Sequence, residues 1–396
     1  MIKDKSSKEL FEFIRTIDTK DIPSLKTILS SYTLEKISVD QLLVSLKYSG
    51  EKTLLIDARS EKEFDESSLP YSKNFPVLNN FERHNVGLIY KKYSQSSALW
   101  LAMQYANPKV ESLKQCLSQN EADKKTIYVY CWRGGGRSGY LSKMIIDLGY
   151  KPIVLIGGQK SFRKCVNNFF SRKTFPNELL ELSGLTGSGK SELLQSVSDE
   201  LPIIDLEFSA KHYSSLLGHI PYEIRNFKPV QGQSAFENDI YSQIYLNSIH
   251  STHSKHSALY LIESESKKVG DFEIPKMLYE KLITAPTIKI ISLLENRVKR
   301  IVKDYFGDNL NGIEPMKKIM LEKDKFFRQQ VSNKVYDELI LLLDQKRVKE
   351  FTEIMIVEYY DKKYKDKGKK PLAKISTDDI DIAKTEVLRV YNSLAP

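Results

Sequence analysis

The sequence predicts two α/β domains with parallel sheets, followed by a helical C-terminal region. Short apolar strands alternate with helical segments between residues 53 and 170, and a second series of strands begins after residue 178. Beyond residue 295 the apolar residues recur at helical spacing instead. Strands that alternate with helices are typical of parallel sheets, because each helix carries the chain back to the same edge. A length of 396 residues suits two or three domains.

The first part of the chain divides into an extension and a domain. Residues 1–36 are expected to form an N-terminal helical extension, because Leu10, Phe11 and Ile14 fall on one side of a helix. Residues 37–170 form the first α/β domain. Its strands are predicted at 53–57, 126–130 and 152–156, and its later helices at 138–148 and 159–170.

The second α/β domain is predicted over 171–310, beginning with a polar linker at 171–178. Its strands follow at about 179–184, 202–206, 258–262 and 288–293. Residues 311–396 are expected to be a helical C-terminal region, with a lysine-rich turn at 362–370 and a last helix near 378–394.

Composition excludes several classes of protein. Three cysteines are too few for a disulfide framework and suit a reducing compartment. No run of about 18 apolar residues is present, and the N-terminus lacks the apolar core of a signal peptide. We therefore expect a cytoplasmic protein without a membrane partner. A net charge of +9 favours polyanionic partners such as nucleic acid. The sequence does not indicate an oligomeric state.

A cysteine stands where a predicted strand meets a helix, in the segment CWRGGGRS (131–138). Successive glycines let backbone N–H groups converge on an anion, and the helix N-terminus adds to their field. The same field lowers the pKa of a thiol. Cys131 is therefore a predicted nucleophile, although a strand-end cysteine is often a small core residue. Arg133 and Arg137 are expected to add positive charge, and Gly134, Gly135, Gly136 and Ser138 to form the anion loop.

The segment GLTGSGKS (184–191) matches the phosphate-binding loop G-x-x-x-x-G-K-[ST]. It lies between a predicted strand and a predicted helix, as such loops do. Its amides wrap phosphates, Lys190 reaches the terminal one, and Ser191 is the expected ligand of Mg²⁺. The motif does not distinguish a nucleotide from another diphosphate. The predicted phosphate-binding residues are Gly184, Thr186, Gly187, Ser188, Gly189, Lys190 and Ser191.

Two acidic residues, Glu263 and Glu265, follow the predicted strand at 258–262. This is the place of the carboxylate that accompanies a phosphate-binding loop. A solvated strand end is the alternative interpretation.

The first domain resembles the rhodanese family, in which a loop cysteine carries transferable sulfur. Asp57, Arg59 and the pair Glu63-Phe64 are similar to that family's early strand and helix. Five residues separate Cys131 from Arg137, one more than in simple sulfurtransferases of this fold. The wider loop resembles phosphatases of the rhodanese fold and should fit a tetrahedral anion. The spacing leaves both chemistries open.

The two loops together, in this order, resemble tRNA 2-selenouridine synthases over about residues 37–310. Besides both loops, the matching segments are GGQKSFR (157–163), DLE (205–207), QSAFEN (233–238), ESESKKVG (263–270) and ENRVKRI (295–301). The resemblance implies further polar site residues, whose individual roles it does not assign. They are Asp57, Arg59, Asp205, Glu207, His212, Gln233, Glu237, Glu263 and Glu265.

The resemblance implies a transferase acting on the wobble uridine of tRNA. Such enzymes attach a geranyl group from geranyl diphosphate to 2-thiouridine and then replace S-geranyl with selenium from selenophosphate. A phosphate-binding loop suits a diphosphate leaving group, which Mg²⁺ would stabilise. The cysteine loop suits selenophosphate, whose selenium Cys131 is expected to attack or accept.

Several side chains are candidates for tRNA binding. Arg297, Arg300 and the 362–370 segment offer charge for phosphates, although a lysine run is often only a solvated face. Trp132, with the adjacent Tyr130, offers an aromatic ring for a flipped base, or else packs in the core.

Two other functions remain open from the residues alone. One is a phosphatase or sulfurtransferase fused to a kinase-like module, which needs no tRNA. The other is a non-catalytic sensor that binds an anion and a nucleotide through the two loops. Neither accounts for segments 233–238 and 263–270.

Overall fold

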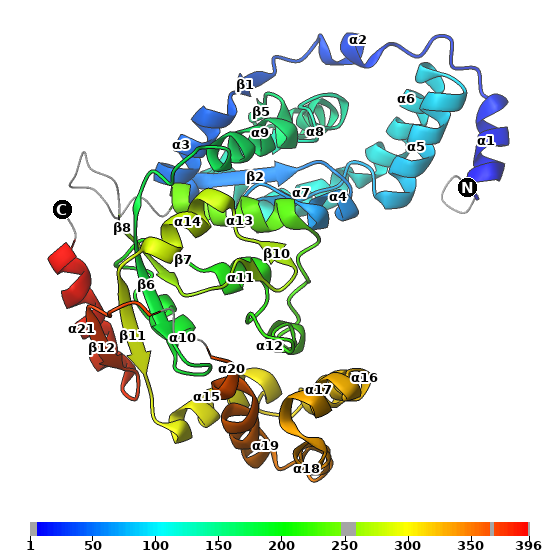
Figure 1. Ribbon diagram of the computed structural model, residues 1–396. Helices are drawn as coiled ribbons and strands as arrows, with labels where there is room; N and C mark the ends of the chain where they lie inside the picture. The colour runs from blue at the N-terminus through cyan, green and yellow to red at the C-terminus, as the bar shows by residue number, and fades with distance from the viewer. Residues whose placement is uncertain (1–5, 247–258, 365–367, 395–396) are drawn as a thin grey trace. The chain divides into compact units, whose positions relative to one another are not determined.

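A computed structural model describes residues 6–246, 259–364 and 368–394 of the chain (Figure 1). The chain forms two compact units, residues 1–168 and 169–396. Each has its own parallel sheet and its own buried core. The predicted fold class is therefore confirmed.

The first unit is built on a five-stranded parallel sheet of order β1-β5-β4-β2-β3. The central strands are almost entirely buried and apolar, as parallel strands covered on both faces must be. The strands are β1 (Glu35–Ile37), β2 (Thr53–Asp57), β3 (Lys73–Asn74), β4 (Thr126–Tyr130) and β5 (Pro152–Leu155).

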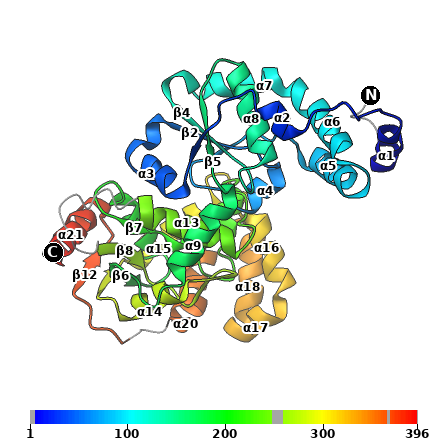
Figure 2. The ribbon, with the colours of Figure 1, turned by 90° about the horizontal axis from the view of Figure 1, so that it is seen from above.

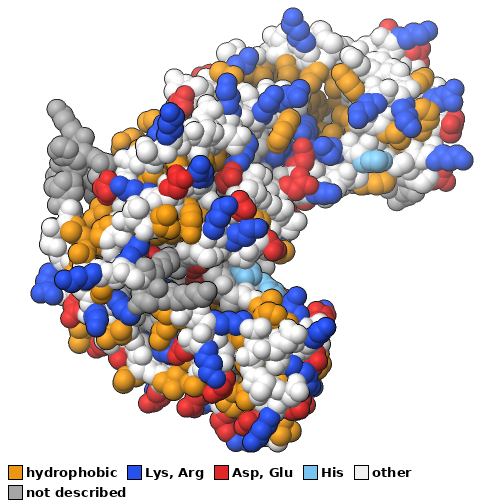
Figure 3. Space-filling view, viewed as in Figure 1, with side chains coloured by type: hydrophobic (Ala, Val, Ile, Leu, Met, Phe, Trp, Pro, Cys, Tyr) orange, Lys and Arg blue, Asp and Glu red, His pale blue; other side chains and the backbone are white. Residues whose placement is uncertain are grey.

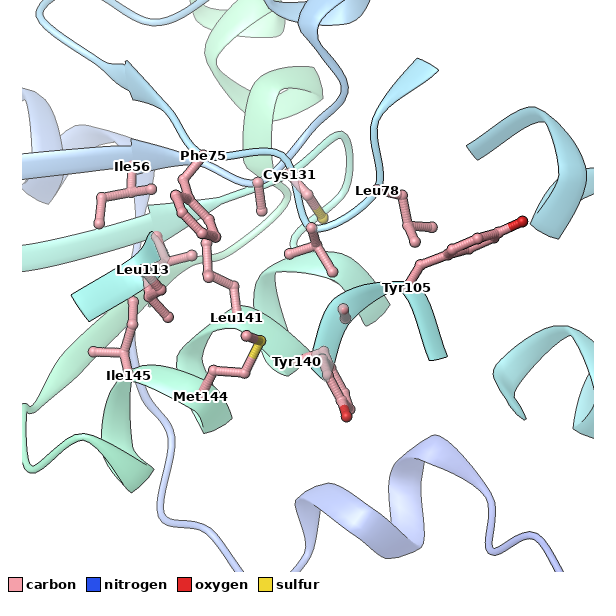
Figure 4. Close-up of a cluster of buried hydrophobic side chains, with 14 of the residues drawn as sticks. Ile56, Phe75, Leu78, Tyr105, Leu113, Cys131, Tyr140, Leu141, Met144 and Ile145 are labelled. Carbon is pink, nitrogen blue, oxygen red and sulfur yellow. The ribbon is translucent and has the colours of Figure 1, made fainter. Parts of the chain in front are cut away.

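Helices cover both faces of this sheet. Alternate residues of β4 face opposite sides: Ile127 and Val129 join the main core, whereas Tyr128 meets Ser45 of α3. Figure 4 shows part of that core, with Cys131 among its members. The helices are α1 (Ser7–Arg15), α2 (Leu25–Leu29), α3 (Val39–Ser49), α4 (Glu61–Glu66), α5 (Asn80–Lys92), α6 (Gln95–Ala106), α7 (Val110–Gln119), α8 (Gly136–Asp147) and α9 (Gly158–Phe170).

The N-terminal extension is less separate than predicted. Leu10 and Ile14 of α1 are buried in the core of the first unit, and residues 35–37 form β1 beside β5. The strand was missed because EKI is short and only one of its three residues is apolar.

The second unit carries a five-stranded parallel sheet of order β12-β11-β6-β8-β7, of which Figure 2 labels β12, β6, β8 and β7. A two-stranded antiparallel ribbon joins β9 (Lys268–Val269) to β10 (Phe272–Glu273). The sheet strands are β6 (Glu178–Gly184), β7 (Ile203–Ile204), β8 (Leu259–Glu263), β11 (Thr287–Ile291) and β12 (Ala373–Ser376).

Three cores organise the helices of this unit. One side of the sheet packs on α10 (Lys190–Ser196) and α21 (Ile380–Leu394), and the other on α13 (Gln233–Leu246) and α14 (Lys276–Thr284). A third core lies within a helical subdomain. It is made of α12 (Ile220–Ile224), α15 (Leu294–Phe306), α16 (Ile313–Glu322), α17 (Asp324–Val331), α18 (Asn333–Asp344), α19 (Val348–Ile354) and a π-helical segment at 355–360, followed by the short α20 (Asp361–Lys363).

Two strand predictions need correction. The region 311–396 is not helical throughout, because residues 373–376 form β12 alongside β11. The strand expected over 202–206 is shorter, since Asp205 caps the next helix, α11 (Leu206–Ala210). Residue 258, where a strand was predicted to begin, lies outside the described residues; the described strand is β8. Within the described ranges, no helix has both the length and the apolar character needed to cross a membrane.

Candidate functional site

The cysteine loop closes around the sulfur of Cys131. The chain leaves β4, turns through Gly134 with φ of +67°, and enters α8 at Gly136. The Gly135 N–H donates to Sγ at 3.3 Å, and the Ser138 hydroxyl lies 3.3 Å from it. The predicted anion loop is therefore formed at the N-terminus of a helix.

The surroundings of Cys131 favour its thiolate. Burial raises the pKa of the thiol, since only 4% of the residue is exposed. Hydrogen bonds from the Ser138 side chain and from backbone N–H groups of Ser138, Arg133 and Gly135 outweigh burial, and the pKa lies below its ordinary value. By contrast, burial raises the pKa of Cys116 and Cys165. Only Cys131 has the character of a nucleophile.

Arg137 is engaged elsewhere. Its guanidinium makes a bidentate ion pair with Glu63, which also pairs with Arg83 at 3.0 Å. Arg137 therefore does not act on the loop as a free cation, because its guanidinium is bound to Glu63, a carboxylate that it shares with Arg83. Hydrogen bonds of the loop stabilise the thiolate instead. Arg133 is exposed.

A second turn fixes the backbone of the cysteine loop. The N–H groups of Gln159 and Lys160 donate to the carbonyls of Cys131 and Trp132, at 2.9 and 3.0 Å. Gly158, with φ of +53°, lies so close that a Cβ there would stand 2.0 Å from the Cys131 carbonyl. Only glycine fits that position. The segment GGQ is thus structural support for the loop.

Asp57 and Arg59 form a buried ion pair. Their exposed fractions are 0% and 2%, and Arg59 Nη2 lies 2.6 Å from Asp57 Oδ2 and 2.6 Å from the Ser67 carbonyl. The pair ties the end of β2 to the following loop. It leaves neither group available to a substrate, so the structure assigns both a supporting role.

The two aromatic side chains beside Cys131 differ. Trp132 is 44% exposed, so the core-packing interpretation is wrong. Tyr130 is completely buried, and its hydroxyl accepts from the Leu69 N–H and donates to Ser72. Of the two, only Trp132 is open to a base.

The phosphate-binding loop of the second unit has its predicted form. It joins β6 to α10, and Gly187 and Gly189 take φ values of +73° and +83°. A Cβ on Gly184 would stand 2.5 Å from the Ile290 carbonyl. Lys190 Nζ donates to the carbonyls of Gly184 and Leu185, at 3.0 and 3.3 Å. The ammonium therefore lies within the loop.

Carboxylates converge on Ser191. Its hydroxyl lies 2.8 Å from Glu207 Oε2 and 3.1 Å from Glu263 Oε2, and the Glu207 N–H donates to Glu263 at 2.8 Å. Burial raises the pKa of both carboxyls well above the ordinary value, and mutual repulsion, with that of Glu265, adds to the shift. Glu263 and Glu265 are buried, so the solvated strand end is excluded.

Hard oxygen ligands of this kind suit Mg²⁺. Among the described residues, no group of three or more His, Cys, Asp or Glu has the arrangement of a metal site. Magnesium commonly uses one or two carboxylates together with substrate phosphates, so Ser191, Glu207 and Glu263 fit that smaller set.

Other predicted polar residues lie apart from the two loops' direct contacts, and two of them, Asp205 and Gln233, hold the backbone of neighbouring elements. Asp205 caps α11, accepting from the Phe208 N–H at 2.7 Å. Gln233 binds the Glu273 backbone in both directions, at 2.7 and 3.0 Å, and donates to Glu237 at 3.1 Å. His212 is half-buried against Gly218 and Gly270, and burial lowers its pKa.

Arg297 was wrongly predicted to bind tRNA. It is 4% exposed, donates to the Thr186 carbonyl at 2.9 Å, and pairs with Asp361 at 2.6 Å. Arg300 pairs with Glu192 at 2.7 Å. Both arginines lie against the phosphate-binding loop: Arg297 binds the Thr186 carbonyl, and the Arg300 guanidinium lies beside Gly189.

The lysine-rich segment is also partly structural. Lys369 pairs at 2.6 Å with Glu181, which is fully buried in β6, and Lys362 pairs with Glu358. Residues 365–367 lie outside the described residues.

Comparison with known proteins decides the family. The AAA domain model of tRNA 2-selenouridine synthase matches residues 177–391, more than half of the chain. The chain belongs to the tRNA 2-selenouridine synthase family. A rhodanese-like domain model matches residues 40–165 of this family member.

Curated relatives bearing the family name support this. The tRNA 2-selenouridine synthase of Nitrosomonas eutropha is 32% identical over 64% of this chain and 63% of its own length. That of Bdellovibrio bacteriovorus is 30% identical over 71% of each chain, and that of Shewanella frigidimarina 29% identical over 74% of this chain and 80% of its own. The match thus spans less than two thirds of the first of these relatives.

The residues that pair with the predicted site residues could not be predicted from the sequence. The rhodanese resemblance includes Glu63 but not its ion pair with Arg137, and no motif contains Asp361 or Thr377. Thr377 donates to the Ser188 carbonyl at 2.5 Å from 189 residues away. No local pattern marks such a contact.

Proposed function

We propose that this chain is a transferase that converts 5-substituted 2-thiouridine at the wobble position of tRNA into 2-selenouridine through an S-geranyl intermediate. The observation that carries the proposal is a thiolate-stabilising cysteine loop and a phosphate-binding loop in one member of this family. Geranyl diphosphate, selenophosphate and tRNA are the substrates, and the cytoplasm is the proposed location.

The first step is assigned to the phosphate-binding loop. The sulfur of 2-thiouridine attacks C1 of geranyl diphosphate, the C–O bond breaks, and diphosphate leaves with the electron pair while N3 loses its proton. Lys190 and the loop amides bind the diphosphate. Ser191, Glu207 and Glu263 would hold Mg²⁺, which supplies charge neutralisation for the leaving group when bound.

The second step is assigned to Cys131. Its thiolate attacks C2 of the S-geranyl nucleoside and displaces geranylthiolate, which takes up a proton. The selenium of selenophosphate then displaces Cys131 from C2, and water cleaves the Se–P bond to release phosphate. Direct transfer of selenium to the thiolate would reduce phosphorus, so attack at C2 is the balanced route. The loop amides hold the selenophosphate anion, and exposed Trp132 stacks on the base.

Two variants separate the steps. Cys131→Ser should accumulate S-geranyl tRNA and form no selenouridine, whereas Lys190→Ala should form neither product. Nucleoside mass spectrometry of 2-thiouridine tRNA, with each donor omitted in turn, measures both. Selenouridine formed by Cys131→Ser would overturn the role of the cysteine.

The same preparation tests the other functions. Hydrolysis of an aryl phosphate or turnover of thiosulfate, with unchanged tRNA, would favour a phosphatase or sulfurtransferase. Binding of nucleotide and anion without any turnover would favour a sensor.

A further inference from the structure

A largely apolar cavity of about 430 Å³ lies beside the cysteine loop, wholly within the first unit. Its volume falls in the usual range of small-molecule sites. In Figure 3 a hollow lined by hydrophobic side chains is visible over the region of α2, α5, α6 and α8. The two loops described above do not account for it.

The cavity touches the loop directly. Gly136 and Arg137, the first residues of α8, line it. Leu78 also lines it and belongs to the same buried cluster as Cys131 (Figure 4). A group held in the cavity therefore lies beside the end of the cysteine loop that enters α8, and Leu78 links the cavity to the buried cluster that contains Cys131.

Its walls come from outside the central sheet. Residues 22–25 close one side, before the rhodanese-like match begins at residue 40, and α5 and α6 form another. Two glycines of α8 allow residues 25–29 to pack this closely. A Cβ on Gly136 would stand 2.9 Å from the Leu25 side chain, and a Cβ on Gly139 would stand 2.7 Å from that of Leu29. The N-terminal extension thus gains a role as a cavity wall.

The lining selects an uncharged guest. Aliphatic side chains of Val77, Leu99, Ala102 and Met103 face the cavity. Arg137 is the one charged residue in the lining, and its guanidinium is held in an ion pair with Glu63. An apolar cavity without free charge favours a hydrocarbon over a diphosphate.

We propose that this cavity binds the hydrocarbon chain of the S-geranyl nucleoside while C2 of the base lies at the cysteine loop. The identification of the ligand as a geranyl group rests on the proposed function. The existence of an apolar binding site does not. Geranyl diphosphate carries the same hydrocarbon as the S-geranyl nucleoside, so the test includes experiments that distinguish these two ligands.

The test uses geraniol, the chain alone, in calorimetric titrations of the full-length protein. Geraniol should bind the unchanged protein. Ala102→Trp, which fills the cavity, should weaken binding by at least about tenfold. Gln104→Trp, on the exposed side of α6, is the matched control and should bind as the unchanged protein does. Met103→Trp is a second filling variant if the first does not fold, as judged by circular dichroism.

Two further experiments distinguish geranyl diphosphate from the S-geranyl nucleoside as the ligand of the cavity. Lys190→Ala should bind geraniol normally but lose affinity for geranyl diphosphate. With S-geranyl tRNA and selenophosphate supplied, Ala102→Trp should form less selenouridine, yet it should still geranylate 2-thiouridine tRNA. The inference is overturned if geraniol does not bind the unchanged protein, or if both filling variants bind geraniol as tightly as the unchanged protein does. Failure of the proposed function would instead leave tRNA unchanged while geraniol still bound in the cavity.

Discussion

At the scale of single residues, the Cys131 thiolate depends on a hydroxyl that sequence alone does not distinguish from its neighbours. Burial opposes ionisation, and the Ser138 side chain makes the largest contribution against it. We expect Ser138→Ala to shift the pH profile of Cys131 alkylation to higher pH. Iodoacetamide labelling at a series of pH values, located by mass spectrometry, measures the profile.

The matched control for this variant lies one turn further along α8. Ser142 is buried and its hydroxyl has no hydrogen-bond partner among the described residues. Ser142→Ala should leave the Cys131 profile where it is. An unchanged profile in Ser138→Ala would show that the loop amides suffice.

The buried pair of Asp57 and Arg59 should be costly to break. Arg59→Met leaves a fully buried carboxylate without its cation, which predicts a loss of about 3–5 kcal/mol in the free energy of unfolding of the first unit. Urea denaturation measures it. Arg15→Met, which breaks an exposed pair with Glu12, should change the free energy by less than about 1 kcal/mol. Equal effects of the two variants would contradict a structural role for Arg59.

Arg297 should behave as a support of the phosphate-binding loop rather than as a tRNA contact. Arg297→Met removes the bonds to Thr186 and Asp361, and should cost about 1–3 kcal/mol of stability. It should also weaken diphosphate binding in calorimetry, but leave the salt dependence of tRNA binding unchanged. Lys299→Met, in an exposed pair with Glu295, is the control. A lower salt dependence in Arg297→Met would restore the tRNA role.

Both loops were predictable because the groups that give each loop its chemistry come from one short continuous segment of the sequence. Cys131 to Ser138 and Gly184 to Ser191 each need particular residue types at fixed spacing. The fate of Arg137 and Arg297 was not predictable, since Glu63 and Asp361 lie 74 and 64 residues away. A charged side chain is assigned to solvent, substrate or partner only when the chain has folded.

At the scale of elements, β12 extends the sheet and also supports the phosphate-binding loop. Its Ile375 is 1% exposed in the core beneath α21, and Thr377 just after it donates to Ser188. Ile375→Ala should cost about 2–5 kcal/mol and weaken diphosphate binding. Lys374→Ala, on an exposed position of the same strand, should change stability by less than about 0.5 kcal/mol. Urea denaturation measures the free energy of unfolding of both variants, and calorimetry measures their diphosphate affinity. If Ile375→Ala is destabilised but binds diphosphate normally, β12 does not support the phosphate-binding loop.

Long central strands were predicted well, and edge strands were not. The runs of β2 and β4 are apolar and buried on both faces, so composition alone marks them. The edge strands β1 and β12 each have one neighbour in the sheet and expose polar residues. Their pairing is decided by contacts far away along the chain, which periodicity does not record.

At the scale of the whole molecule, each proposed step has its own compact unit. The cysteine loop depends on contacts within residues 1–168, and the phosphate-binding loop on contacts within 169–396. A substitution in one loop should therefore leave the other unit folded and functional. A mixture of Cys131→Ser and Lys190→Ala should then form selenouridine, although neither variant does so alone.

This prediction has a definite mechanism. Cys131→Ser supplies S-geranyl tRNA, and Lys190→Ala uses it through its intact cysteine loop. Nucleoside mass spectrometry of the mixture, with geranyl diphosphate and selenophosphate, measures the product. The double variant Cys131→Ser/Lys190→Ala, mixed with either single variant, is the control and should form no selenouridine. If the mixture also fails, but Lys190→Ala converts purified S-geranyl tRNA, the intermediate is not released between the steps. If Lys190→Ala cannot convert it, the assignment of the steps to separate units is wrong.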